Sequence, residues 1–472
     1  MWRLSLSGLV LLLGTALAAC GHEPWVLYRE RCASCHGSSR YGGYGPPLIP
    51  SALRRKTDPQ LLAVILEGRP NTQMPAFAEV LDEAEARSLV ALMREPVGDI
   101  AWGVQDIRAS RIDYEIELER IPPSVRRENL ILVVERGTGS VSVLDGDSMR
   151  ELDRYEVGRI HGGPKFDRAY RKVLVSTRDG TLAAYDLERG GLVTKVKVGV
   201  NTRNVALSPN GDFAAVANQL PANLVVLDGD LAPLRSFPLP GQPSGVYQLP
   251  GENRFLLALR DAPRLYRIDY PELTLNSDEV PEPFEDFVFV PGRKQLLASS
   301  RGGQRLLLYD LGERKVLGEL PTEGLPHLFS ACFFTRDGAL YAAVNHIGVP
   351  RLSLIAMDSF RIEKEISLRG SGYFVRTHPG TPYLWADTNT EEIQLIDKQS
   401  LELLERALVP EPMKKAMHVE FTADGRRALV SIWDSQGAVV VYDSRTLEEL
   451  RRLPYDMPIG KYNAFNKTRF MR

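Results

Sequence analysis

The sequence predicts a small all-α domain followed by an all-β eight-bladed propeller. Two observations carry this prediction. Near the amino end, the run from Cys32 to His36 reads C-x-x-C-H, the attachment motif of a c-type haem. Over the remainder of the chain, a strand-like run that ends in Asp recurs eight times. We therefore expect a c-type cytochrome domain ahead of a ring of repeated sheets.

The C-x-x-C-H motif supplies both anchors and one axial ligand of a haem. The thiols of Cys32 and Cys35 can each add to a vinyl group, and His36 can ligate the iron from the same turn. A zinc half-site or a redox pair has the same spacing, but no second C-x-x-C completes a zinc site. Met74, 38 residues after His36, is predicted to place its thioether opposite that histidine; Met93 is the weaker candidate because it falls in a helical apolar pattern.

Length and composition indicate a folded protein of more than one domain. The chain has 472 residues, of which 44% are hydrophobic and 25% are charged. A net charge of −2 gives no reason to expect nucleic acid or an anionic membrane surface as a partner. The four cysteines do not form a disulfide framework, because two belong to the haem motif and Cys332 lies in an apolar run.

Residues 1–20 read as an export signal, with a basic residue, an apolar run and then small residues. The apolar run is too short to span a bilayer in the mature protein. The ending Leu-Ala-Ala-Cys20 is similar to a bacterial lipoprotein cleavage site, at which Cys20 would carry lipid; an ordinary signal with an incidental cysteine is the alternative. In both cases we expect a periplasmic protein, and only a lipid on Cys20 would attach it to a membrane.

Residues 23–96 are predicted to form the helical haem domain, and residues 97–120 a linker. Asp58 followed by Pro59 is typical of a helix start, with Asp58 as the N-cap, and Gly68 is typical of its end. A closing helix is expected from Asp82 to Met93.

The repeats in residues 121–472 predict the propeller. The third strand of each unit should end at Asp145, Asp186, Asp228, Asp269, Asp310, Asp358, Asp397 and Asp443. These marker aspartates are 39 to 48 residues apart, close to the roughly 40–45 residues of a four-stranded blade. Each unit also has an earlier apolar strand and turn-forming residues. Eight units imply eight blades.

The phase of the repeat locates a candidate site. Counting back 25 residues from a marker aspartate gives His161, Arg203, Ser244 and His418, while His327 stands 31 residues before Asp358 at a similar strand start. In a propeller these strand starts surround the mouth of the central channel, so the side chains should converge there. Three of only seven histidines fall at or near this phase. One histidine there would more often be structural, but the set indicates ligands or catalytic groups.

A second phase supports the same site. Arg136, Arg260 and Arg301 each stand nine residues before a marker aspartate, and Arg178 stands eight before. The loops that hold them should open on the face where the strand starts lie. Any one of these arginines could be a solvated turn residue. Together with the histidines they describe a cavity for a flat, iron-bearing ligand fringed with carboxylates, because guanidinium binds carboxylate through two parallel hydrogen bonds.

These residues resemble the cytochrome cd1 family, in which a c-type haem domain precedes an eight-bladed propeller that holds haem d1. The resemblance covers nearly everything after the export signal, including residues 102–103, 157–161, 176–180, 198–203 and 458–466. It implies that His161 is the proximal ligand of the d1 iron. It also implies that Arg178 and Arg203 bind carboxylates of the macrocycle, and that His327 is one of two distal histidines that serve nitrite reduction.

The resemblance has one departure. The second distal histidine of the nitrite reductases belongs in the stretch from Leu384 to Asn389, which contains none. Because nitrite reduction consumes protons at the distal side, its absence favours the biosynthetic dihydro-haem d1 dehydrogenase branch. That branch oxidises a propionate side chain of the d1 precursor to an acrylate. Electrons would pass to the haem on Cys32 and Cys35 and then to a periplasmic acceptor.

The roles of two histidines stay open at this point. Either His327 or His418 could take a proton from the substrate, or provide the second iron ligand. Two other functions also remain: a divergent cytochrome cd1 nitrite reductase, and a non-catalytic haem d1 carrier. In the biosynthetic reading, cytochrome cd1 nitrite reductase could be the recipient of the finished haem d1.

Overall fold

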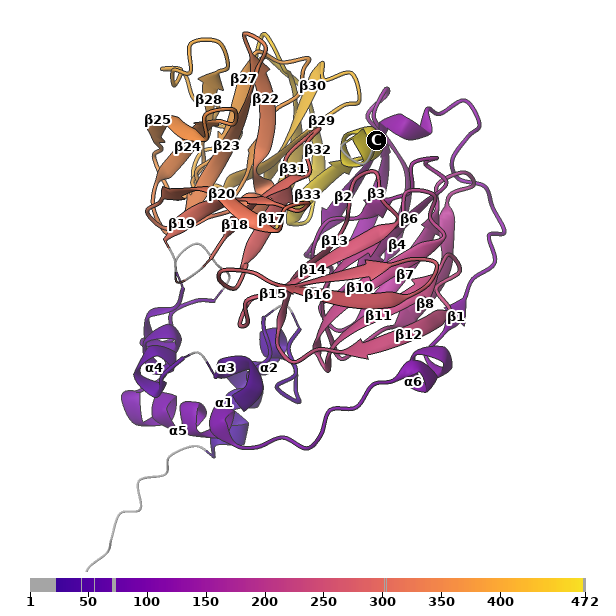
Figure 1. Ribbon diagram of the computed structural model, residues 1–472, viewed down its shortest axis with the longest axis vertical. Coiled ribbons are helices and arrows are strands. Elements are labelled where there is room, and N and C mark those ends of the chain that lie inside the picture. The colour runs from indigo at the N-terminus through magenta and orange to yellow at the C-terminus, as the bar shows by residue number, and fades with distance from the viewer. Residues whose placement is uncertain are drawn as a thin grey trace, which may run out of the picture.

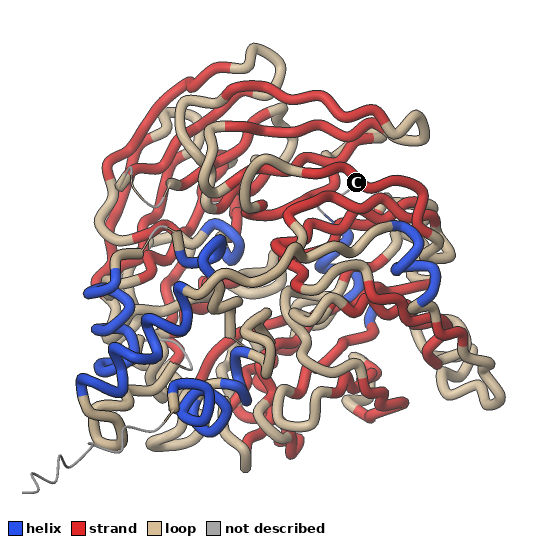
Figure 2. Tube along the Cα trace, turned by 90° about the horizontal axis from the view of Figure 1, so that it is seen from below, coloured by secondary structure: helices blue, strands red, loops and turns tan. Residues whose placement is uncertain are grey.

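The computed structural model describes residues 23–43, 45–54, 56–69, 74–300, 302 and 304–469. The predicted export signal with Cys20, and Arg301, lie outside these residues. Within the described ranges, no helix combines the length and the apolar character needed to cross a bilayer. The helices of residues 24–94 gather at one side of a much larger body of strands (Figures 1 and 2).

The amino-terminal domain is all helical. Its helices are α1 (Pro24–Arg31), α2 (Ala33–His36), α3 (Pro50–Leu53), α4 (Asp58–Glu67) and α5 (Glu83–Arg94). They enclose an apolar core to which Leu61, Leu89 and Met93 contribute. Met93 is buried in α5, as its helical pattern predicts.

The cap of α4 is one residue earlier than predicted. Thr57, and not Asp58, is the N-cap: its hydroxyl accepts from the backbone N–H of Gln60 at 3.4 Å, and the Gln60 side chain accepts from the Thr57 backbone N–H at 3.0 Å. This reciprocal pair satisfies two amide groups that the first turn leaves unbonded. Asp58 therefore occupies the first helical position.

The linker is attached to the propeller. It contains α6 (Val104–Ala109) and the short strand β1 (Ile112–Asp113), which pairs with β8. The indole Nε1 of Trp102 donates to the carbonyl of Lys197 at 2.7 Å. These contacts fix the path of the linker along blade 2.

Eight sheets follow around a ring, and we number them as blades in chain order. Blade 1 holds β2 (Leu130–Glu135), β3 (Ser140–Asp145) and β4 (Arg150–Glu156), after the 3-10 turn η1 (Arg127–Asn129). Blade 2 holds β5 (Lys165–Phe166), β6 (Lys172–Ser176), β7 (Thr181–Asp186) and β8 (Gly191–Lys197). Blade 3 holds β9 (Asn201–Leu207), β10 (Phe213–Leu220), β11 (Ala222–Asp228) and β12 (Pro233–Pro238). Blade 4 holds β13 (Pro243–Gln248), β14 (Arg254–Leu259), β15 (Arg264–Asp269) and β16 (Thr274–Glu279).

The second half of the ring is less regular. Blade 5 holds β17 (Asp286–Phe289), β18 (Gln295–Ser299), β19 (Arg305–Asp310) and β20 (Lys315–Pro321). Blade 6 holds β21 (Leu325–Pro326), η2 (Leu328–Ser330), β22 (Cys332–Arg336), β23 (Ala339–Ile347), β24 (Arg351–Ala356) and β25 (Arg361–Ser367). Blade 7 holds β26 (Val375–Arg376), β27 (Tyr383–Asp387) and β28 (Ile393–Asp397). Blade 8 holds β29 (Ala416–Phe421), β30 (Arg427–Ile432), β31 (Gly437–Asp443) and β32 (Glu449–Tyr455).

The last strand closes the ring. β33 (Pro458–Asn463) pairs antiparallel with β2, so the carboxyl end completes blade 1. Helix α7 (Ala464–Thr468) follows and packs against β2 and β5. Because closure pairs the first and last strands of the ring, β33 supplies the fourth strand of blade 1 and joins the two ends of the propeller.

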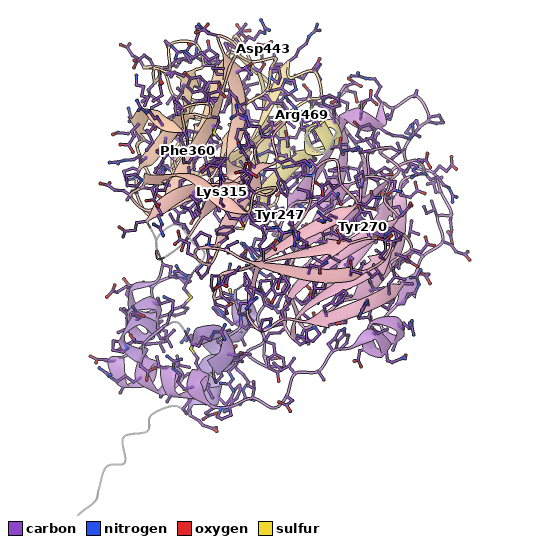
Figure 3. The ribbon with its side chains drawn as sticks, in the orientation of Figure 1. Tyr247, Tyr270, Lys315, Phe360, Asp443 and Arg469 are labelled. Carbon is purple, nitrogen blue, oxygen red and sulfur yellow. The ribbon has the colours of Figure 1, made fainter. Side chains whose placement is uncertain are left out.

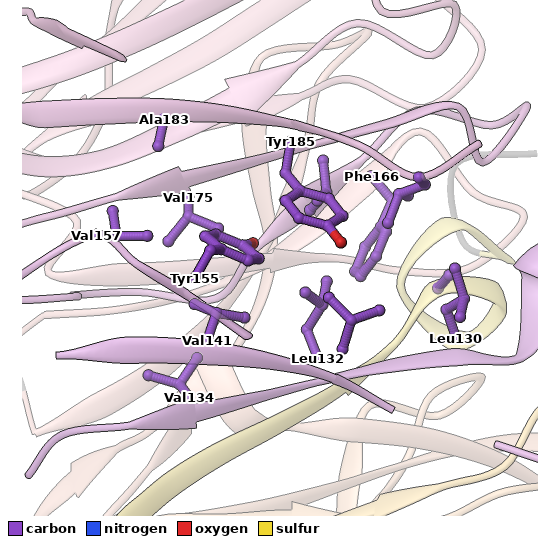
Figure 4. Packing of buried hydrophobic residues seen from close by; sticks show 14 of the residues in the cluster. Leu130, Leu132, Val134, Val141, Tyr155, Val157, Phe166, Val175, Ala183 and Tyr185 are labelled. Atoms are coloured by element: carbon purple, nitrogen blue, oxygen red, sulfur yellow. The ribbon is translucent and has the colours of Figure 1, made fainter. Parts of the chain in front are cut away.

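Apolar side chains fill the space between neighbouring blades. Figure 4 shows this packing between blades 1 and 2, where Leu132, Val141 and Val175 surround the stacked rings of Tyr155 and Tyr185, 4.3 Å apart. Burying one such aliphatic side chain contributes about 1.5–3 kcal/mol. The strands that bury these apolar side chains therefore hold neighbouring blades together, and they fix which residues face the channel.

The marker aspartates shape the turn between the third and fourth strands. The carboxylate of Asp186, for example, accepts from the backbone N–H of Glu188 at 2.7 Å and of Arg189 at 2.9 Å. Asp145, Asp228, Asp310, Asp397 and Asp443 accept from following backbone amides in the same way. This is the turn chemistry that Asp favours. Figure 3 places Asp443 at the outer edge of the ring and Tyr247, on β13, near its middle.

Candidate functional site

The haem motif begins at Cys32, between α1 and α2, and its remaining residues form α2. Cys32 ends the first helix and precedes the second, and neither Cys32 nor Cys35 is in a disulfide. The Nδ1 atom of His36 lies 2.7 Å from the carbonyl of Pro46. Because a carbonyl only accepts, Nδ1 carries the proton and Nε2 keeps a lone pair for a metal. Burial lowers the pKa of His36, which favours this neutral ligand form.

The loop after the motif is shaped to this histidine. A Cβ at Gly45 would lie 2.5 Å from Cε1 of the His36 ring, so any larger residue would collide with it. Met74 is half-buried, and its carbonyl accepts from the backbone N–H of Arg69 at 3.0 Å. The donor set of two thiols and a neutral imidazole fits a covalently bound haem.

The side chains that the repeat phase singled out lie at the starts of neighbouring blades. Arg203 is on β9 and Ser244 on β13, whereas His161 stands just before β5. His161 Nδ1 donates to the carbonyl of Arg203 at 3.1 Å, and Arg203 Nε donates to the carbonyl of Ser244 at 2.7 Å. Residues from blades 2, 3 and 4 thus form a chain of contacts along the channel wall. Since Nδ1 of His161 donates, its Nε2 is the atom with a free lone pair.

Four guanidinium groups meet beside His161, and we call Arg136, Arg178, Arg203 and Arg260 the arginine cluster. Burial and the other three arginines lower the pKa of Arg178 to about 9. Burial and then Arg178, Arg203 and Arg136 hold the pKa of His161 well below its usual range. Glu285 balances part of the charge, 3.1 Å from Arg260. The buried Nε of Arg178 has no hydrogen-bond partner among the described residues.

Such a cluster is unfavourable until an anion enters it. Buried cations that repel one another are stabilised by a partner of opposite charge, and carboxylates match guanidinium geometry. A ligand with several carboxylates would therefore offset the charge of the arginine cluster and give the Nε of Arg178 a hydrogen-bond partner.

His327 and His418 come together on the opposite side of the channel, and we call them the histidine pair. The ring of Phe374 lies between them, with centroids 6.0 Å from His327 and 4.8 Å from His418. Burial lowers the pKa of His327 to about 4 and holds that of His418 well below its usual range. Both imidazoles are therefore neutral at pH 7.

The two histidines differ in which nitrogen carries the proton. His327 Nδ1 lies 2.6 Å from the carbonyl of Tyr373 and so must donate, which leaves a lone pair on Nε2. His418 Nδ1 accepts from the backbone N–H of Lys461 at 3.3 Å, which puts the proton on Nε2. That Nε2 is buried without a partner among the described residues. His327 thus offers an acceptor, and His418 offers a donor.

His418 sits in an unusual backbone position. It is the extra residue of a bulge in β29, with φ of 51°, in the left-handed region that non-glycine residues seldom adopt. The bulge turns the imidazole into the channel. Lys461, fully buried on β33, donates from Nζ to the carbonyl of His418 and to the hydroxyl of Ser431.

Sequence reasoning missed several groups at this site. Phe374, Asp387, Lys461 and Tyr462 surround the histidine pair, and none carries a recognisable motif. Burial raises the pKa of Asp387 to about 6 and that of Asp286, near Arg203, to about 7. The repeat phase picks out β29, and the ring joint places β33 beside it. That phase was therefore the one sequence signal that could have pointed to the residues of β33.

The cytochrome domain lies against the blades that carry the arginine cluster. Asn201 Nδ2 donates to the carbonyl of Tyr41 at 3.4 Å, and Arg54 forms an ion pair with Asp261. A Cβ at Gly43 would overlap the guanidinium of Arg159. Arg69, near Met74, acts electrostatically on Tyr373 of the histidine side. The haem motif and the channel site therefore face a common boundary, visible in Figure 1 below the ring.

Comparison with known proteins agrees with this architecture. The family described as "Cytochrome D1 heme domain" matches residues 125–467, and "Cytochrome C oxidase, cbb3-type, subunit III" matches residues 21–93. A dihydro-heme d1 dehydrogenase of Pseudomonas aeruginosa is 43% identical over 97% of this chain and 96% of its own length. The chain belongs to the cytochrome cd1 family, on its dihydro-haem d1 dehydrogenase branch.

Two further comparisons agree with this assignment. A solved structure described as dihydro-heme d1 dehydrogenase NirN in complex with DHE has a TM-score of 0.79 and 39% identity, covering 94% of this chain and all of that one. Protein NirF of Pseudomonas aeruginosa is 30% identical over 72% of this chain and 92% of its own length. As a member of this family, the protein is an oxidoreductase with covalent haem c and a propeller for a d1-type haem. The predicted fold class is confirmed.

Proposed function

We propose that this protein oxidises a propionate side chain of a bound dihydro-haem d1 to an acrylate. The conversion of a single to a double C–C bond breaks two C–H bonds and releases two electrons and two protons. The observation that carries the proposal is the division of the channel into an arginine cluster and a neutral histidine pair. One side can hold carboxylates, and the other can accept a proton.

His161 is the proposed ligand of the substrate iron. Its Nδ1 is held by the carbonyl of Arg203, so Nε2 is the ligating atom. Arg178 and Arg203 hold carboxylates of the macrocycle, with Arg203 oriented through its contact to Ser244.

His327 is the proposed proton acceptor. Its Nε2 has the lone pair, and its lowered pKa keeps it neutral before the reaction. His418 then serves as a donor from Nε2–H, which orients a carbonyl or carboxylate oxygen of the substrate. The tautomers therefore support His327 as the proton acceptor and His418 as the hydrogen-bond donor.

Cys32 and Cys35 would hold the haem covalently, His36 and Met74 are the proposed ligands of its iron, and the bound haem would supply a one-electron relay. The boundary formed by Arg54, Asp261 and Asn201 keeps this relay beside the channel. Replacement of Met74 by Ala should lower the reduction potential of the haem, because a thioether ligand raises it. An unchanged potential would remove Met74 from the ligand set.

Location and partners form a further part of the proposal. An export signal and covalent haem support a periplasmic protein, in contact with a periplasmic electron acceptor and, as recipient of the product, a cytochrome cd1 nitrite reductase. Lipid on Cys20 can be tested by the mass of the mature protein and by a Cys20→Ala variant, which should move from the membrane to the soluble periplasmic fraction.

One experiment separates the candidate functions. The purified holoprotein is mixed anaerobically with dihydro-haem d1, with and without an electron acceptor, and the extracted macrocycle is analysed by mass. A dehydrogenase yields a product lighter by two hydrogen atoms only with the acceptor. Tight binding without oxidation would identify a carrier, and turnover of nitrite with a reduced donor would identify a nitrite reductase. Either result would overturn the proposal.

A further inference from the structure

Asp387 connects the two members of the histidine pair through the backbone. It ends β27, and its side chain is fully buried. Its Oδ1 accepts from the backbone N–H of Tyr373 at 2.7 Å and of Phe374 at 3.1 Å. Its Oδ2 accepts from the backbone N–H of His418 at 3.2 Å. One carboxylate therefore ties segments of blades 7 and 8 together.

The first of these bonds reaches His327. Oδ1 fixes the backbone at Tyr373, and the carbonyl of Tyr373 accepts from His327 Nδ1 at 2.6 Å. The position of that carbonyl decides which nitrogen of His327 holds the proton. Asp387 thus acts on the proposed proton acceptor through one intervening peptide.

The second bond reaches His418. A non-glycine residue at positive φ costs of order 1–3 kcal/mol and persists only where surrounding contacts hold it. The amide of His418 is fixed by Asp387, and its carbonyl by Lys461. These two contacts keep the bulge in place and the imidazole beside Phe374.

Glycines in the segment before β26 leave room for this carboxylate. A Cβ at Gly372 would overlap the backbone of Asp387, and one at Gly370 would overlap the carbonyl of Thr388. Glycine at both positions lets the segment before β26 lie directly on the end of β27. The close approach brings the amides of Tyr373 and Phe374 within reach of Oδ1.

We propose that Asp387 is a positioning residue for the dehydrogenation, which sets the orientation and tautomer of His327 and the bulge of His418 together. The proposal rests on the proposed function above. An anionic carboxylate suits this role because all three of its partners are donors. An amide in its place offers one acceptor oxygen and turns an NH2 group toward a backbone N–H.

The test compares Asp387→Asn and Asp387→Ala with a matched control, Asp167→Asn. Asp167 is also fully buried and also accepts two backbone amides, those of Arg171 at 2.8 Å and Lys172 at 3.0 Å, but it holds the turn between β5 and β6. The holoproteins are assayed for kcat and for dihydro-haem d1 affinity by absorption titration. Both Asp387 variants should lose about 10–100-fold in kcat, while the Kd changes less than about threefold. The control should lose thermal stability and keep kcat.

A second measurement needs no substrate. In hydrogen exchange of the holoprotein without dihydro-haem d1, residues 416–421 and 371–376 should exchange faster in the Asp387 variants than in wild type and in Asp167→Asn. Wild-type kcat in Asp387→Asn, or exchange rates unchanged from wild type, would overturn the positioning role. If wild type itself does not oxidise dihydro-haem d1, the proposed function fails instead, and the exchange measurement still reports on the contacts of Asp387.

Discussion

The arginine cluster and the histidine pair lie in different halves of the same ring and differ in electrostatic character. The cluster comes from blades 1 to 4, and burial together with the other three guanidinium groups lowers the pKa of Arg178. The pair comes from blades 6 to 8, with Phe374 between two imidazoles that burial keeps neutral. Four guanidinium groups crowd one side, whereas the other side holds two neutral imidazoles among charged groups of both signs, Asp387 and Lys461.

This difference separates binding from proton transfer. Buried cations gain most from an anionic ligand, so the cluster is suited to hold carboxylates. A proton acceptor must be unprotonated before the reaction, so the pair is suited to an environment that disfavours charge. If the division is correct, substitutions in the histidine pair must lower kcat, and substitutions in the arginine cluster must weaken the binding of dihydro-haem d1.

The largest effect is expected on the histidine side. His327→Ala should lower kcat by about 10²–10⁴-fold, because the substrate loses its proton acceptor. Affinity for dihydro-haem d1 should change little, since the proposed iron ligand and the arginines remain. Single-turnover oxidation and absorption titration measure the two quantities. Unchanged turnover in both His327→Ala and His418→Ala would remove histidine chemistry from the mechanism.

A smaller effect of the opposite kind is expected on the arginine side. Arg178→Gln should weaken binding of dihydro-haem d1 by about 10–100-fold, the value of one hydrogen bond to a charged group. The kcat at saturation should stay near wild type. Arg264→Gln, on the exposed face of β15, is the control and should change neither constant. A loss of kcat with unchanged affinity in Arg178→Gln would contradict the division.

The histidine side should also make stability depend on pH. The folded pKa of His327 is about 4, whereas an unfolded histidine titrates near 6.5. Between these values the unfolded chain binds more protons, so stability falls as pH falls through this window, by about 3–4 kcal/mol at most from this residue. Unfolding temperatures from pH 7 to pH 4.5 should decline less steeply in His327→Gln. Parallel curves would show that His327 does not carry this linkage.

The smallest effect should appear in the arginine cluster without substrate. Arg178→Gln removes a buried charge that three other arginines repel, so the substrate-free protein should unfold about 1–3 °C higher than wild type. The same variant should bind dihydro-haem d1 less well. One protein can therefore show both the higher unfolding temperature and the lower affinity. A lower unfolding temperature would mean that the Arg178 contact to Gln219 outweighs the repulsion.

The sequence by itself determined the features that depend on a few neighbouring residues. The haem motif occupies one helical turn, and the marker aspartates bond amides two or three residues ahead, so both follow from local chemistry. Their recurrence also predicted the blades and the neighbours His161, Arg203 and Ser244, because a repeated unit places equal phases at equal positions in a ring.

Only the tertiary structure decided the contacts that cross between blades. The proton positions on His327 and His418 depend on Tyr373 and Lys461, which no spacing connects to them. Asp387 and the ring joint of β33 with β2 likewise depend on closure of the whole propeller. The physical reason is that a turn is fixed by bonds within a few residues, whereas a channel wall is fixed by how eight separately formed sheets pack against one another.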